Sequence, residues 1–166
     1  MSALEIDVIK NVRKGAIWLL IAPIVLIIGI LVMPIIAGLL IGPSIASNLQ
    51  SITPSSGVAS IFSGVASIAN ATVALFFALI FIAFIIADFL FFLSFGSFRT
   101  GFKELPNMTL GSIGGLVGKI GALIQIVAFA AATALLFIVY LTLSSGGTLS
   151  SVTRMINFAF IFNNHR

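Results

Sequence analysis

Three long apolar segments determine what this chain can fold into. They cover residues 16–42, 71–95 and 113–143, and a helix needs about 20 apolar residues to cross a bilayer. Because the hydrocarbon core offers no water to backbone N–H and C=O groups, each segment must satisfy these groups within a helix. The sequence therefore predicts an all-α, polytopic membrane protein with three transmembrane helices in a single membrane domain, residues 1–166. Pro23 and Pro34 lie inside the first segment, where we expect them to bend the helix.

The composition supports lipid as the main solvent of the chain and excludes several kinds of chemistry. Only 7% of the 166 residues are charged and 60% are hydrophobic, whereas soluble domains carry about 25% charged residues. There is no cysteine, and the single histidine is His165, so a thiolate metal site or a histidine-based catalytic dyad within one chain is not expected. We expect no catalytic, cofactor-binding or metal-binding residues, and hence no enzyme.

The lysines and arginines predict the orientation of the chain. The stretch between the first two spans, residues 43–70, carries no charge at all. The cationic residues of the preceding tail and of the region around the next connection are Lys10, Arg13, Lys14, Arg99, Lys103 and Lys119. Because Lys and Arg mark cytoplasmic segments, we expect a cytoplasmic N-terminus and a C-terminus outside. Since the cations flank apolar runs, we interpret them as topology signals and expect no nucleic-acid partner.

Two further segments are expected outside the bilayer. Residues 53–70 carry serines and Asn70 at spacings of four and three, opposite an apolar side, which predicts an outer amphipathic helix. An extension of the second span's helix and a flexible serine-rich loop are the alternatives. The C-terminal tail, residues 144–166, is too short to span, so we expect it to lie at the outer interface or to pack on a partner.

A glycine-rich run from Gly111 to Gly121 opens the third span. It does not fit a phosphate-binding loop, because isoleucine occupies positions 113 and 120, where that motif needs Gly and Ser or Thr. Small residues four apart instead allow two helices to approach closely in lipid. The residues that we expect at such a helix contact are Gly114, Gly118, Gly121 and Ala122.

Asp88 is a lone carboxyl group in the second span. A charged side chain near the bilayer centre costs about 2.5–3.5 kcal/mol, so Asp88 should face protein or water. At 1.5 Å per residue it lies about 15 Å from the inner end of its span, and Gln125 lies at about 18 Å. We therefore expect Asp88, in its protonated form, to donate a hydrogen bond to Gln125. An ion pair with Lys119, an ion or proton relay, and a contact to another subunit are the alternatives.

Two stretches resemble a known family. The charged segment that ends in KGAIWLLIA, and RTGFKEL followed by GSIGGLVGKIG, are similar to the DUF973 family of uncharacterised archaeal membrane proteins from Sulfolobus-type thermoacidophiles. The resemblance covers about a third of the chain. It implies several spans in an archaeal cell membrane, some of them beyond those of this chain, and it implies no activity and no site residues.

These patterns favour a small structural or accessory subunit that packs with itself, as a homo-oligomer, or with a larger membrane complex. Its other partners are the membrane lipids. A small channel or proton-coupled carrier that uses Asp88 is the alternative function. A membrane or capsid protein of an archaeal virus is a second alternative.

Overall fold

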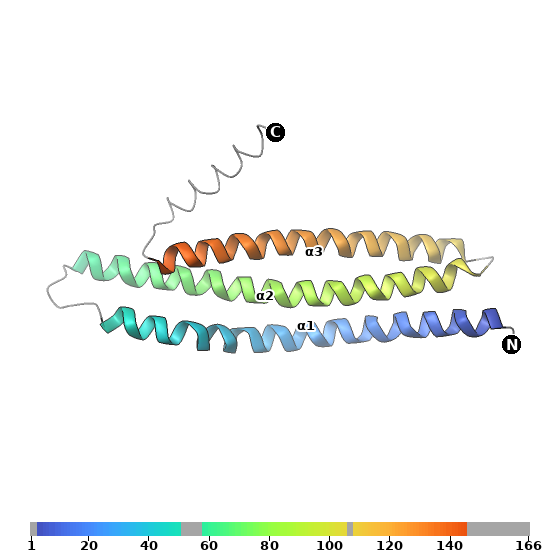
Figure 1. The fold of residues 1–166 in the computed structure, drawn as a ribbon, viewed down its shortest axis with the longest axis horizontal. Helices are drawn as coiled ribbons and strands as arrows, with labels where there is room; N and C mark the ends of the chain where they lie inside the picture. Colours follow the sequence, from blue (N-terminus) through green and yellow to red (C-terminus); the bar gives the residue numbers. More distant parts are fainter. Residues whose placement is uncertain (1–2, 51–57, 106–107, 146–166) are drawn as a thin grey trace, which may run out of the picture. The chain divides into compact units, whose positions relative to one another are not determined.

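The computed structural model describes residues 3–50, 58–105 and 108–145, and over these ranges the chain folds into three helices (Figure 1). These are α1 (Ala3–Gln50), α2 (Val58–Lys103) and α3 (Thr109–Ser144). All three are long and apolar enough to cross a membrane, with candidate spans at Glu5–Pro43, Ile68–Lys103 and Thr109–Ser144. The predicted all-α fold with three membrane-length helices is confirmed.

The helices extend past the predicted spans. Helix α1 runs through Pro23, Pro34 and Pro43 without an interruption. Helix α2 already begins at Val58, so most of the segment predicted to be an outer amphipathic helix is continuous with the second span. Its first residues, 53–57, and the tail beyond Ser145 lie outside the described residues.

The chain divides into two compact units, and each helix contributes to both. The first unit contains Met1–Val32 and Ile80–Ala131, and the second contains Met33–Leu79 and Ala132–Arg166. In the first unit α2 lies between α1 and α3 (Figure 1). In the second unit the buried core consists of small and branched aliphatic side chains, including Ala74, Leu75 and Ala78 of α2.

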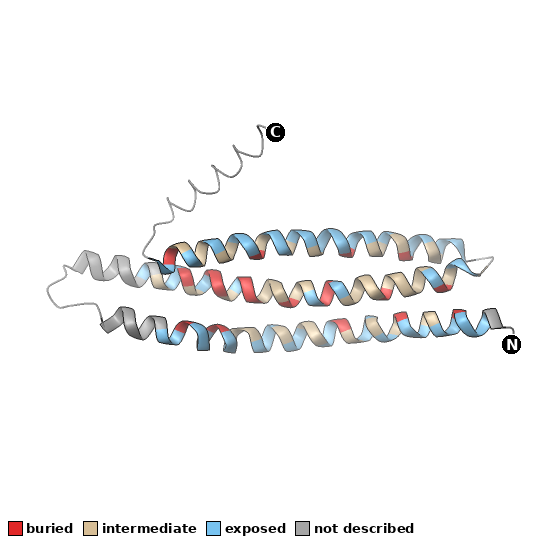
Figure 2. Cartoon of the chain, viewed as in Figure 1, coloured by how far each residue is buried: buried red, intermediate tan, exposed pale blue. Residues whose placement is uncertain are grey.

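Helix α2 is the most buried of the three. In its most apolar window 39% of the residues are buried, against 11% for α1 and for α3. Figure 2 shows the same contrast, with buried positions recurring along α2 while α1 and α3 are largely exposed. The large exposed side chains on α1 and α3 are almost all aliphatic, which is the composition that acyl chains favour.

Candidate functional site

The contact between α1 and α2 in the first unit has small residues at its closest points, and the Phe98 ring of α2 lies against Gly15 of α1. A methyl group placed on Gly29 would lie 2.5 Å from the Cβ of Ala83, so the two backbones are in close approach there. Nearer the N-terminus, Ser94 donates a buried hydrogen bond of 2.8 Å to the carbonyl oxygen of Gly15. This contact joins the helices through backbone proximity and one polar bond between them.

The contact between α2 and α3 is built differently, from aromatic side chains of α2 and glycines of α3. Phe102 lies against Gly111, and Phe95 lies against Gly118, where an added methyl group would come within 2.6 Å of the ring. A step of seven residues back along α2 thus matches a step of seven forward along α3. This is the antiparallel heptad register of two packed helices.

Of the four residues that the sequence predicted at a helix contact, two lie at the contact between α2 and α3 or are buried, and two have open space around them. Gly118 lies against the Phe95 ring, and Ala122 is buried with 4% of its surface exposed. Gly114 and Gly121 have no heavy atom within 4 Å of where a Cβ would stand. Gly115 lies instead at the contact, 2.9 Å from the backbone nitrogen of Arg99 when a Cβ is added.

Asp88 lies on the side of α2 that faces α3. One heptad beyond the pair Phe95 and Gly118, the same register brings Asp88 level with Gln125. Asp88 is buried, with 7% of its surface exposed, and its Oδ2 atom has no hydrogen-bond partner in the described part of the chain. The predicted bond to Gln125 is therefore not formed at Oδ2, and the Gln125 side chain is exposed.

Lys119, the alternative partner of Asp88, points elsewhere. Its Nζ atom lies over the ring of Phe92, 4.5 Å from the ring centroid, in a cation–π contact. Such a contact stabilises the ammonium group near the end of the span. The charge of Lys119 is thus held one turn of α2 away from Asp88.

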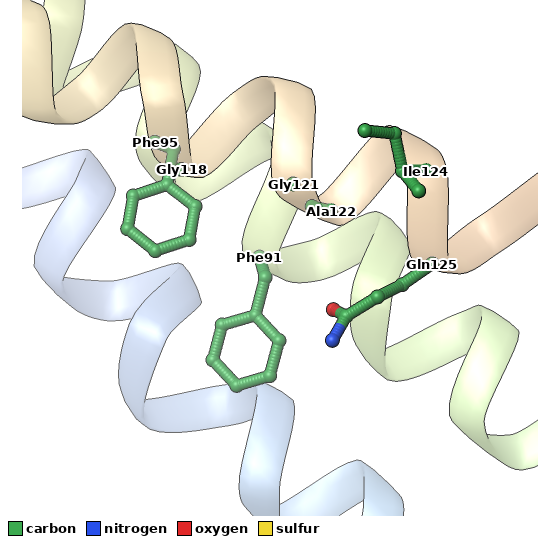
Figure 3. A pocket seen from close by; sticks show the side chains of 7 residues that line it. All are labelled: Phe91, Phe95, Gly118, Gly121, Ala122, Ile124 and Gln125. Atoms are coloured by element: carbon green, nitrogen blue, oxygen red, sulfur yellow. The ribbon is translucent and has the colours of Figure 1, made fainter.

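A pocket of about 450 Å³ opens between α2 and α3. It is lined by Phe91, Phe95, Gly118, Gly121, Ala122, Ile124 and Gln125. Figure 3 shows the Gln125 side chain extending from α3 toward the Phe91 ring, so the pocket has an apolar wall and one amide group. This surface suits an apolar chain or a helix, and it has no nucleophile or acid–base pair for catalysis.

Two buried hydroxyl groups were not among the candidates drawn from the sequence. Ser94 is fully buried in the first unit, and Thr133 is buried in the second, where its Oγ1 atom has no partner among the described residues. Thr133 is the single hydroxyl residue of an apolar run, and Ser94 follows directly on one, which is the signal that would have identified them. Ser94 is the one whose hydroxyl joins two helices.

No group of three or more His, Cys, Asp or Glu side chains that could hold a metal ion occurs within the described ranges. The fold and these contacts define a polytopic helical membrane protein. The chain belongs to the DUF973 family, described as "Protein of unknown function (DUF973)", whose model matches residues 5–163. No curated protein and no solved structure matches the chain.

Proposed function

We propose that this protein is a structural or accessory subunit that packs with itself or with a larger membrane complex through the uncovered side of α3. The observation that carries the proposal is a row of small and polar residues on this side. Gly114, Gly121, Gln125 and Ala128 follow one another at steps of seven, four and three, and all four are exposed. Residues at these spacings share one side of a helix.

This row has the chemistry of a helix–helix interface. The space over Gly114 and Gly121 is open, and small residues allow a second helix to approach closely in lipid. An amide group such as that of Gln125 is costly to leave unpaired among acyl chains. A second helix on this side would supply a hydrogen-bond partner for Gln125.

The test is a small-to-large exchange that the single chain tolerates. Gly121→Leu adds a side chain where the structure has room, so the helices should form and melt as in the unchanged protein. An approaching helix would be held away, and we expect the oligomer or complex to be lost. Mass measurement of the protein extracted in mild detergent, together with whatever co-purifies with it, provides the readout.

Ala130→Leu is the matched control, because Ala130 is also an exposed small residue of α3 but lies on the opposite side of the helix. It should leave the assembly intact. A monomer that co-purifies with nothing in the unchanged protein would refute the proposal. Equal loss of assembly in both variants would show that the interface is not confined to this side of α3.

A small channel or proton-coupled carrier is the second candidate, and the unpartnered Oδ2 of Asp88 favours it. Intramembrane carboxyl groups often mark proton or ion pathways. In this case Asp88→Asn would fold normally but abolish proton or cation flux in reconstituted vesicles. Unchanged flux in the variant, or no flux in the parent protein, would exclude this function.

We place the protein in an archaeal cell membrane with its N-terminus in the cytoplasm. The charge-free stretch between α1 and α2, against the cationic residues around the turn between α2 and α3, supports this orientation. Because the chain has no cysteine, single cysteines at Ser55 and Met108 would be unique labels. An impermeant thiol reagent should reach them from opposite sides, and labelling from one side would contradict the orientation.

A further inference from the structure

A second cavity lies at the end of the first unit where α2 passes into α3. Its volume is about 450 Å³, and its lining comes from the last two turns of α2, the residue that follows α2 and one residue of α3. The lining residues are Gly96, Arg99, Thr100, Lys103, Glu104 and Lys119. Three cations and one carboxylate therefore surround one space, which we name the basic cavity.

The cations of the basic cavity outnumber its one carboxylate, that of Glu104. In the part of the chain that the structure describes, Arg99, Lys103 and Lys119 form no ion pair with a carboxylate. The ammonium group of Lys119 is positioned by the Phe92 ring at 4.5 Å. The backbone of Arg99 lies against Gly115, which fixes where its side chain leaves α2. One cationic group, that of Lys119, is thus held by an aromatic ring, and no carboxylate of the described residues pairs with any of the three.

The position of the basic cavity in the bilayer suggests the class of that group. The cavity lies at the end of three apolar helices, where lipid headgroups are expected, and on the side that we expect to be cytoplasmic. Basic pockets between transmembrane helices on that side suit anionic headgroups. The guanidinium group of arginine binds phosphate oxygens through paired N–H donors.

We propose that the basic cavity binds a phosphate group, with Arg99 as the paired donor and Lys103 and Lys119 as additional cations. An anionic phospholipid and a soluble phosphate share this chemistry, so the experiment must separate them. The purified protein is titrated with phosphatidylglycerol, with phosphatidylcholine and with inorganic phosphate. Bound lipid is counted by native mass spectrometry, and the melting temperature is followed.

The test variant and its matched control are two triple variants, and each removes three positive charges at the same end of the helices. One is Arg99→Gln, Lys103→Gln and Lys119→Gln in the basic cavity. The other is Lys10→Gln, Arg13→Gln and Lys14→Gln on α1, whose neighbour Val12 contacts Gly101 of α2. General attraction between a positive surface and an anionic lipid predicts an equal loss of lipid binding in both variants. A specific site in the basic cavity predicts a loss of lipid binding in the first variant only.

We expect phosphatidylglycerol to bind and to raise the melting temperature more than phosphatidylcholine does. The cavity variant should lose this effect and the α1 variant should keep it. The exposed Lys103 permits a milder test if the triple variant does not fold: Lys103→Gln should weaken binding roughly tenfold, which is about 1.4 kcal/mol and close to the lower end for hydrogen bonds to charged groups.

Stabilisation by inorganic phosphate that equals the effect of phosphatidylglycerol, and that is lost only in the cavity variant, would support the site with a soluble ligand. Three results would overturn the proposal. The first is an equal loss of lipid binding in the two triple variants. The second is equal binding of phosphatidylglycerol and phosphatidylcholine together with no stabilisation by inorganic phosphate. The third is unchanged binding of phosphatidylglycerol by Lys103→Gln.

Discussion

Helix α2 contacts its two neighbours in the first unit with different residues at most of the close points. Toward α1 it presents small residues, Ala83, Ser94 and Gly101, and the backbones come close enough for a hydroxyl group to bond across the contact. Toward α3 it presents phenylalanine rings, and the small residues belong to α3. At Gly29 the Cβ of Ala83 limits the distance, and at Gly118 the Phe95 ring does. Each contact also holds one point of the other kind: the Phe98 ring lies against Gly15 of α1, and the Arg99 backbone lies against Gly115 of α3.

This difference indicates how the two contacts respond to change. A backbone and a Cβ atom have no torsion through which to move aside, whereas a phenylalanine ring turns about its χ angles. Gly29 of the α1–α2 contact should therefore tolerate less added volume than Gly118 of the α2–α3 contact. The same one-methyl exchange at a glycine on each side tests this expectation.

The largest effect is expected at Gly29. Gly29→Ala places a methyl group 2.5 Å from the Cβ of Ala83, so the helices must separate, and overpacking of this kind costs about 1–3 kcal/mol. Unfolding in an SDS titration and the melting temperature provide the measurement. Adding Ala83→Gly should restore stability, and Gly38→Ala on the same helix, where the space is open, should cost nothing. A neutral Gly29→Ala would contradict the close approach.

A smaller loss is expected from Ser94→Ala. It removes the hydrogen bond to the Gly15 carbonyl group, and bonds of this kind within membranes contribute about 0.6 and at most about 1.7 kcal/mol. Ser97→Ala is the control, because the Ser97 hydroxyl group bonds to Leu93 within its own helix. If the two exchanges lower the free energy of unfolding equally, the bond between helices contributes nothing of its own.

The smallest loss is expected at Gly118. Gly118→Ala brings a methyl group 2.6 Å from the Phe95 ring, and the ring can turn away at about 0.5 kcal/mol, the lower end for an off-rotamer side chain. The same exchange made in a Phe95→Leu background should cost nothing, because the ring is gone. A loss at Gly118 as large as that at Gly29 would remove the distinction between the two contacts.

The helices and their membrane length were predictable because hydropathy over about 20 residues depends on the solvent and needs no knowledge of neighbours. The level of Asp88 relative to Gln125 also agrees with the sequence, because helical rise is constant. The family resemblance was drawn from about a third of the chain, and the family model covers residues 5–163. Local pattern was enough for these conclusions.

The rotation of each helix about its own axis was not predictable. Periodicity groups Gly114 with Gly118, but only the shape of α2 selects Gly115 and Gly118 for the contact and leaves Gly114 open. The same limitation applies to Gln125, whose side chain extends toward Phe91 in the pocket between α2 and α3 (Figure 3). The cation–π contact that directs Lys119 to Phe92 likewise depends on how the helices are rotated.

The orientation of Asp88 toward α3 has a consequence for biosynthesis. Helix α2 is made before the helix that covers its carboxyl group, so at the moment of insertion Asp88 faces lipid or the insertion machinery. The leucine, isoleucine and phenylalanine residues around it each favour insertion by about 0.3–0.6 kcal/mol, and together they outweigh a cost of about 2.5–3.5 kcal/mol for the acid. Helix α2 can therefore insert before Asp88 is buried, and the packing of α3 on this side then removes the carboxyl group from lipid.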